Sequence, residues 1–147
     1  MVNAFDVNPH QLIRAAANKL ESTGLPAAPS WVGSVKSGPH AERIPQDEKF
    51  WYMRCASILY QAYGSSPIGV SSMRTHYGGR QNNGVGREHF RRSGGNMIRK
   101  GMQALEKAGL LTKKKVGRYI SPKGQAFMDG VAKEIGGAKK KADAPSQ

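Results

Sequence analysis

The stretch Tyr77–Gly95, YGGRQNNGVGREHFRRSGG, contains the residues of this sequence that are best suited to bind a ligand. It holds four arginines, six glycines and a single acid, Glu88. Glycines let backbone amides approach phosphate groups closely, and arginine side chains hold phosphates with paired hydrogen bonds. Arginine also stacks on nucleobases, which lysine does poorly. We therefore expect a polyanion to be bound here by Arg80, Arg87, Arg91 and Arg92.

The same stretch allows other interpretations. Its glycines can simply make a flexible loop whose arginines are hydrated. His89 and Phe90 can stack on an unpaired base, but a lone phenylalanine in such a loop more often anchors it to the core, and we expect that of Phe90. The stretch lacks the Gly-Lys-Ser/Thr ending of a phosphate-binding loop, which excludes nucleotide hydrolysis.

Positive charge is concentrated in the part of the chain around this stretch. The formal net charge is +13, and residues 74–123 carry thirteen Lys or Arg against two Glu, which is +11. Residues 1–73 carry six against five and residues 124–147 four against three, +1 each. Such a focused excess favours a polyanionic partner that neutralises it. We expect a nucleic acid in preference to a membrane or an acidic protein.

Other classes of protein fit the composition poorly. The chain has 147 residues, 38% of them apolar, which suits one globular domain. No apolar run approaches the roughly 20 residues that cross a bilayer, and MVNAFDVNPH lacks the layout of a signal peptide. We expect a cytoplasmic protein with neither a membrane partner nor a small-molecule substrate.

Residues for catalysis or metal binding are not found in a useful pattern. The four histidines and Cys55 show no ligand spacing, so we expect no metal and no cofactor. Cys55 lies among apolar residues and is expected to be buried. Glu88 and Glu106 are the only acids in the basic half, and neither has a carboxylate partner. We expect no catalytic residue and a protein that is not an enzyme, with Glu106 in a local pair on its own helix.

The elements that must position the basic residues form a winged helix. Apolar spacing predicts helices over Asp47–Tyr63, Ile68–Tyr77 and Asn96–Ala108, the last with a stripe of Ile98, Met102, Leu105 and Ala108. Two short strands, Leu110–Thr112 and Val116–Ile120, follow around a lysine turn. Three helices and a hairpin in this order predict a mostly α, winged-helix fold. The turn before its third helix is normally three or four residues long, whereas here the arginine-rich stretch intervenes.

Further helices flank this core. Asn8 and Pro9 are typical of a helix start, and Gly24 of its stop. The connection Gly24–Pro45 is expected to be pinned to the core by Trp31 and Val35. A last helix begins at Pro122 and carries Phe127 to Ile135. We expect one nucleic-acid-binding domain over residues 1–135 and a disordered tail over residues 136–147.

The third helix and the lysine turn extend the candidate surface. Asn96, Arg99, Gln103 and Lys107 share the helical face opposite the apolar stripe, and Lys100 lies beside them. This pattern also fits an ordinary solvated face. Because Arg91 and Arg92 precede the helix and the wing turn follows it, we expect one phosphate-binding surface. The turn contributes Lys113, Lys114 and Lys115.

Several segments together resemble a known family. FWYMRCASILYQAY, PIGVSSMRTHYGGRQNNGV, HFRRSGG, IRKGMQALEKAGLL and GRYISPKGQAF, with DVNPHQLIRA and PSWVGSVKSGPH, are similar to the S19e family of small-subunit ribosomal proteins of archaea and eukaryotes. The resemblance covers about Phe5 to Ile135. It implies a structural constituent of the small ribosomal subunit that binds ribosomal RNA in the head, contacts neighbouring ribosomal proteins as a monomer, and takes part in maturation of the subunit. A eukaryotic member would pass through the nucleolus.

The resemblance also implies which residues face RNA, and it shows one departure. Many members have a basic residue where this chain has Tyr60. Gly101 is unusual in a helix and suggests close approach of a neighbouring backbone. Arg54 alternatively pairs with Asp47 or Glu48. The RNA-facing positions implied are Arg54, Arg74, Arg80, His89, Arg92, Arg99 and Lys100.

Two other functions fit a basic winged helix. One is a DNA-binding transcription regulator, which wants a short turn so that its third helix enters the major groove. A long basic insertion obstructs that entry, whereas RNA binding spreads over phosphates and irregular joints. The other is a protein-interaction module, which requires an exposed apolar patch that the sequence does not reveal.

Overall fold

The structure is a computed structural model that describes residues 1–23, 25 and 27–142. Five α-helices dominate it, together with two short 3₁₀ turns, Ala4–Asp6 and Val32–Ser34, and two separate antiparallel hairpins. No helix in the described ranges is long and apolar enough to cross a bilayer. The helices are α1 (Pro9–Ser22), α2 (Phe50–Ser65), α3 (Val70–His76), α4 (Gly95–Lys107) and α5 (Pro122–Ala142), and the strands are β1 (Gly79–Gln81), β2 (His89–Arg91), β3 (Leu111–Lys113) and β4 (Arg118–Ile120).

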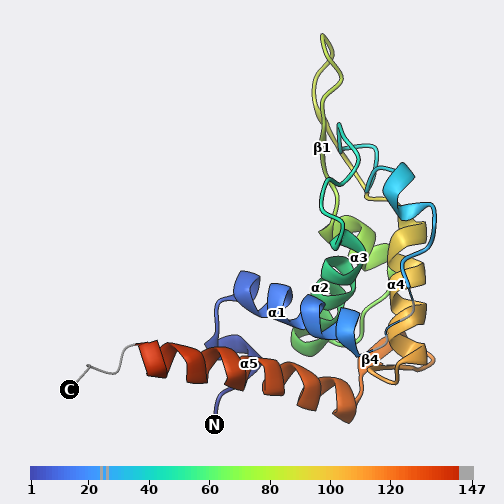
Figure 1. Ribbon diagram of the computed structural model, residues 1–147. Coiled ribbons are helices and arrows are strands. Elements are labelled where there is room, and N and C mark those ends of the chain that lie inside the picture. Colours follow the sequence, from blue (N-terminus) through green and yellow to red (C-terminus); the bar gives the residue numbers. More distant parts are fainter. Residues whose placement is uncertain (24, 26, 143–147) are drawn as a thin grey trace.

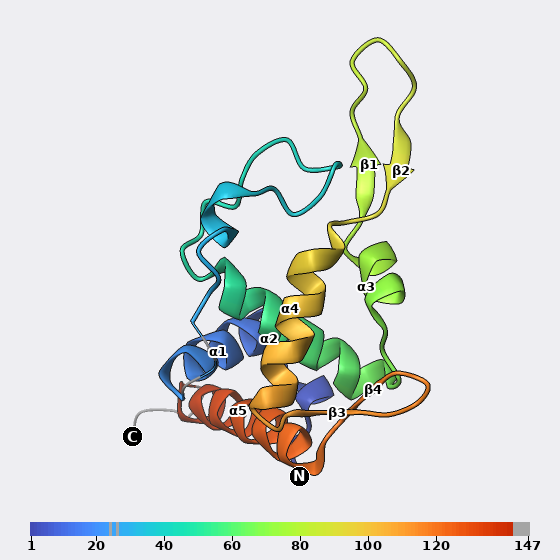
Figure 2. The ribbon, with the colours of Figure 1, turned by 90° about the vertical axis from the view of Figure 1, so that its right-hand side faces the viewer.

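Helices α2, α3 and α4 with the hairpin β3–β4 make the predicted winged helix. Helix α4 packs against both α2 and α3, and β4 lies against α2 (Figure 2). Ile68, just before α3, pairs with Arg118 of β4 through two backbone hydrogen bonds of 2.9 and 3.0 Å. This bridge fixes the wing to the start of α3. The mostly α fold expected from the sequence is confirmed.

Helix α4 buries the predicted apolar stripe and also Gly101, which is not part of that stripe. Ile98, Met102 and Leu105 are at most 1% exposed. Gly101 is also buried, and a Cβ there would lie 3.2 Å from Ile58 Cδ1 and 3.6 Å from Cys55 Sγ. The atoms nearest to Gly101 are therefore side-chain atoms of α2 rather than backbone atoms. The missing side chain instead makes room for side chains of α2, so that α2 and α4 cross closely.

Cys55 is sealed in this helix crossing, as predicted. Burial raises the pKa of its thiol to about 12, because the thiolate would lose its hydration. In the unfolded chain the pKa of the thiol is about 8.5. The contribution of the neutral thiol to stability is therefore complete below that pH and is lost as the pH rises towards 12.

We predict that Cys55 reacts with iodoacetamide only through unfolding. In native protein at pH 8 alkylation should be at least about a hundredfold slower than in denatured protein, because the thiolate is both scarce and enclosed. Mass spectrometry of timed samples measures the two rates. Alkylation at similar rates would show that the α2–α4 crossing is open.

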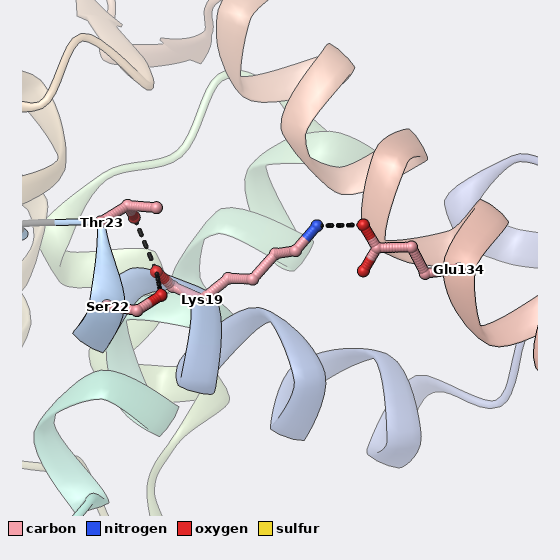
Figure 3. Close-up of polar contacts among 4 residues, drawn as sticks. All are labelled: Lys19, Ser22, Thr23 and Glu134. Carbon is pink, nitrogen blue, oxygen red and sulfur yellow. Dashed lines mark hydrogen bonds and ion pairs between the residues drawn. The ribbon is translucent and has the colours of Figure 1, made fainter.

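Helices α1 and α5 form the extra layer below the winged helix (Figure 1). The Asn8 side chain accepts a hydrogen bond of 3.0 Å from the His10 amide, and Pro9 takes the first helical position. Figure 3 shows Lys19 of α1 donating to Glu134 of α5, with Nζ to Oε1 at 2.5 Å. Tyr63 of α2 donates to Asp129 at 2.9 Å. Two acids of α5 are therefore paired with residues of α1 and α2.

One expected boundary differs from the structure. Helix α5 continues past Ile135 to Ala142, because alanine and lysine favour a helix and the two glycines at 136–137 do not stop it. The part of the expected tail over residues 143–147, and the stop expected at Gly24, lie outside the described residues; Thr23 caps α1.

The connection after α1 is pinned one turn earlier than expected. Trp31 is half-buried against the core, as predicted, and Val32 is 8% exposed. Val35 is 38% exposed, so its expected anchoring role is wrong. The 3₁₀ turn Val32–Ser34 explains the difference, because it directs Val32 inward.

Candidate nucleic-acid interface

The arginine-rich stretch is a β-hairpin that projects from the body (Figures 1 and 2). Strands β1 and β2 pair antiparallel, with Arg80 opposite Phe90 and Gln81 opposite His89. At the tip, the Asn82 side chain accepts from the Gly84 amide at 2.9 Å, and Gly84 takes φ +70°. The Asn83 amide donates to the Arg87 carbonyl at 2.9 Å. The glycines and asparagines thus build an ordered turn rather than a shapeless loop.

Cross-strand pairing distributes the cations over both faces of the hairpin. Opposite residues of an antiparallel pair share a face, and successive residues alternate. Arg80 therefore lies on the same face as Phe90, and His89 and Arg91 lie on the opposite face. The side chains of Arg80, His89, Phe90 and Arg91 are all exposed. A narrow ribbon with cations on each face is suited to lie between phosphate chains.

Phe90 does not anchor the hairpin to the core as expected. Its side chain is 54% exposed. A Cβ on Gly78 would lie 2.9 Å from Phe90 Cζ, so the ring rests over this glycine. The part of the ring that Gly78 does not cover is exposed and is available to stack on a base.

The base of the hairpin is held by backbone contacts from two directions. The Ser93 amide donates to the Arg74 carbonyl at 3.0 Å, and Arg74 Nε donates to the Ser93 carbonyl at 2.9 Å. The Gly94 amide donates to the Ser37 carbonyl at 2.8 Å. Arg74, expected to face RNA, thus also positions the segment that follows β2. The connection before α2 contacts the same segment through Ser37.

Arg54 forms an ion pair with neither Asp47 nor Glu48, the two acids considered from the sequence. Its guanidinium carbon lies 3.9 Å from the ring centre of Tyr77 and 5.1 Å from that of Phe50. Tyr77 Oη and Ser57 Oγ share a hydrogen bond of 2.7 Å. Burial lowers the pKa of the Arg54 guanidinium and raises the pKa of the Tyr77 phenol. Asp47 instead caps the turn before α2, where its side chain accepts from the Lys49 amide at 2.9 Å.

Helix α4 presents the predicted polar face. Arg99 and Lys100 are exposed, as are Asn96 and Lys107, and Gln103 is half-exposed. Glu106 does not pair within its helix as expected. It forms an ion pair with Arg118 of β4, because the wing brings that arginine over the end of α4. This contact removes the one acid of α4 from the exposed cationic face.

The wing stands at the far end of α4 from the β1–β2 hairpin (Figure 2). Lys113, Lys114 and Lys115 are exposed, and Lys114 Nζ lies 4.7 Å from the ring centre of Tyr119. A helix of 13 residues is about 20 Å long. The hairpin and the wing are therefore two basic projections that α4 separates, with the α4 cations between them.

Acids near these cations are scarce. Within the described residues, three of the ion pairs lie in the body of the protein, at Lys19–Glu134, Lys49–Glu21 and Arg118–Glu106. The fourth joins Arg80 to Glu88 on the hairpin, at 3.7 Å between two exposed side chains. An exposed pair of this kind contributes little. The remaining hairpin and α4 cations are thus available to an outside polyanion.

The amino-acid sequence was compared with those of known protein families. The family model described as ribosomal protein S19e matches residues 3–138.

The chain belongs to the ribosomal protein S19e family.

A curated relative is 49% identical over 138 residues, which cover 92% of this chain and 90% of the relative. It is the small ribosomal subunit protein eS19 of Aeropyrum pernix. The resemblance read from the sequence is confirmed.

Within the described residues, no group of three His, Cys, Asp or Glu side chains is arranged to hold a metal ion.

Tyr60, where the resemblance implied a basic residue in many members, packs against the N-terminal segment of this S19e protein. Its ring contacts Phe5 edge-on, with centroids 6.0 Å apart, and Phe5 also contacts Tyr63 at 5.1 Å. Tyr60 is half-buried against the N-terminal segment. In this family member the position therefore packs the N-terminus onto α2.

Sequence reasoning missed the residues that position the hairpin in this S19e protein. Ser37 and Ser93 act through backbone atoms, and Ser93 is 2% exposed. Backbone contacts leave no side-chain pattern, so the sequence held no signal for them. Arg118 was missed as the partner of Glu106, because Glu106 was expected to pair within its own helix and Arg118 lies in the following hairpin.

Proposed function

We propose that this protein is a structural constituent of the small ribosomal subunit that binds small-subunit ribosomal RNA, in the head region. The β1–β2 hairpin, the exposed face of α4 and the wing carry the contact. The observation on which this rests is the set of cations on the hairpin and α4, exposed and largely without acids nearby, in a member of the S19e family. Arg and Lys in such an arrangement neutralise phosphates.

The residues have different tasks in this proposal. Arg80, Arg87, Arg91, Arg92, Arg99 and Lys100 bind phosphates, and His89 and Phe90 stack on unpaired bases. Lys113, Lys114 and Lys115 of the wing reach a second stretch of the RNA, because α4 separates them from the hairpin. Arg54 and Arg74 contact RNA at the base of the hairpin, in addition to their contacts with Tyr77 and Ser93.

The geometry favours RNA over duplex DNA. A DNA-reading winged helix places the N-terminal residues of its recognition helix on base edges in the major groove. In this protein the β1–β2 hairpin stands at that end of α4 (Figure 2). A projecting ribbon there obstructs entry into a regular groove, whereas folded RNA offers irregular joints between helices.

The setting follows from the same proposal. The protein acts as a monomer within a ribosome in the cytoplasm, beside other small-subunit proteins, and contributes to maturation of the subunit. In a eukaryotic cell it would join in the nucleolus. Its role is structural rather than catalytic.

Sedimentation of cell extracts tests the proposal. The endogenous protein should travel with small subunits and remain there at about 0.5 M monovalent salt, since many simultaneous contacts release it slowly. A soluble protein of similar charge, added to the same extract, should be stripped under these conditions. Recovery of the protein at the top of the gradient at low salt would contradict a structural role in the subunit.

A further inference from the structure

A small cavity lies beside the exposed face of α4. Its volume is about 180 Å³, and it is lined by Ala27, Pro29 and Trp51 on one side and by Lys100, Gln103, Ala104 and Lys107 of α4 on the other. Sites for whole small molecules usually measure about 300–1,000 Å³. The cavity is therefore suited to one part of a larger ligand, such as a single planar ring.

One residue of the cavity wall carries an unpaired hydrogen-bond donor. Trp51 is 2% exposed, and its indole Nε1 is buried without a hydrogen-bond partner in the part of the chain that the structure describes. Leaving a buried donor unpaired costs about 1–3 kcal/mol, so buried tryptophans usually find a partner. An acceptor supplied by a ligand, after a small adjustment of the wall, would satisfy it.

The rim of the cavity selects for an anionic ligand. Lys100 and Lys107 are exposed and lie two turns apart on α4, with Gln103 between them. Ala27 and Pro29 contribute an apolar wall that can contact the flat side of a ring. Flanking cations, an apolar wall and hydrogen-bonding groups at the centre match an unpaired nucleotide better than a protein side chain.

We propose that this cavity receives one unpaired nucleobase of the bound RNA. The base accepts a hydrogen bond from Trp51 Nε1, its edge meets the Gln103 amide, and Lys100 and Lys107 hold the phosphates on either side. The proposal rests on the proposed function, because the RNA on the α4 face brings the base to the cavity. It adds a site that reads an unstacked base to a surface that otherwise grips phosphates.

The indole N–H resonance of Trp51 in the full-length protein is a direct probe. Nitrogen-15 spectra should be recorded with single-stranded oligomers of A, C, G or U, and with an abasic ribose-phosphate oligomer of equal length. We expect a downfield shift of the Trp51 resonance with at least one base-bearing oligomer and none with the abasic one. The variant Trp31→Phe assigns the signal, because the chain has two tryptophans.

A cavity-filling variant supplies the affinity readout. Ala104→Met should reduce affinity for the base-bearing oligomer about tenfold, to that for the abasic one, which corresponds to about 1.4 kcal/mol. Gln103→Glu is the second variant, which leaves the cavity open but should weaken binding by repelling the phosphates. If the spectrum of Ala104→Met shows that this variant is unfolded, the Trp51 shift in the parent protein still tests whether a base enters the cavity.

Each outcome has a distinct meaning. Binding of all oligomers without a Trp51 shift overturns the base site and leaves the proposed function standing. An equal shift with the abasic oligomer means that the cavity takes phosphate, and this result overturns the proposal. Failure of every oligomer to bind contradicts the proposed function itself, and the base site with it.

Discussion

The variant Arg80→Ala/Arg92→Ala/Arg99→Ala is expected to bind small-subunit ribosomal RNA with a salt dependence about two to three log–log units shallower than that of the parent. Each phosphate contact contributes about 0.7 to 0.9 to this slope. At 0.1 M salt the affinity should fall about a hundred- to a thousandfold. Filter binding over a series of salt concentrations measures both quantities.

The fold should survive these three changes. All three side chains are exposed, and the one ion pair lost, between Arg80 and Glu88, is also exposed. A control, Arg14→Ala/Lys133→Ala, removes two exposed cations from α1 and α5. Per charge removed, it should change the slope far less. A triple variant that binds and assembles into subunits as well as the parent would refute the assignment of this surface.

The variant Gly78→Ala is expected to displace the hairpin without altering its charge. A Cβ at this position would lie 2.5 Å from the Arg91 carbonyl oxygen and 3.1 Å from that of Arg74, both backbone atoms. Because neither strand nor helix can yield cheaply, we expect a loss of about 1–3 kcal/mol in the free energy of unfolding. Thermal unfolding should show a Tm lower by about 3–10 °C.

RNA binding separates this effect from a simple loss of stability. At a temperature where the variant is folded, its affinity should still fall about tenfold, since the hairpin leaves its place over α3. Gly33→Ala is the matched control, because nothing lies within 4 Å of the added Cβ. Equal Tm and affinity for the two variants would show that the hairpin base tolerates movement.

The helical framework could be predicted because its signals are local. The spacing of Ile98, Met102 and Leu105 fixed the buried face of α4, and Asn8 with Pro9 fixed the start of α1. The wing was predicted from two short apolar strands around a polar turn. The charge of the candidate site was also readable, since it depends on composition and position in the chain.

The shape of the site could not be predicted, because it depends on contacts between distant residues. The β1 and β2 strands are three residues long, and Phe90 is their one large apolar residue, so no apolar period marked them as strands. Phe90 lies over Gly78 across the hairpin, and Glu106 pairs with Arg118 because the wing folds back over α4. The cavity beside Trp51 joins α2 to α4 and the connection before them, which no single segment reveals.

The central claim is that ribosomal RNA lies against the hairpin and the exposed face of α4. Ultraviolet cross-linking of purified small subunits, followed by mass spectrometry of the nucleotide-bearing peptides, tests it most directly. We predict cross-links within residues 77–107, with His89 and Phe90 among the attachment sites. Cross-links confined to α1 and α5, with the hairpin arginines still open to chemical modification in the assembled subunit, would contradict the claim.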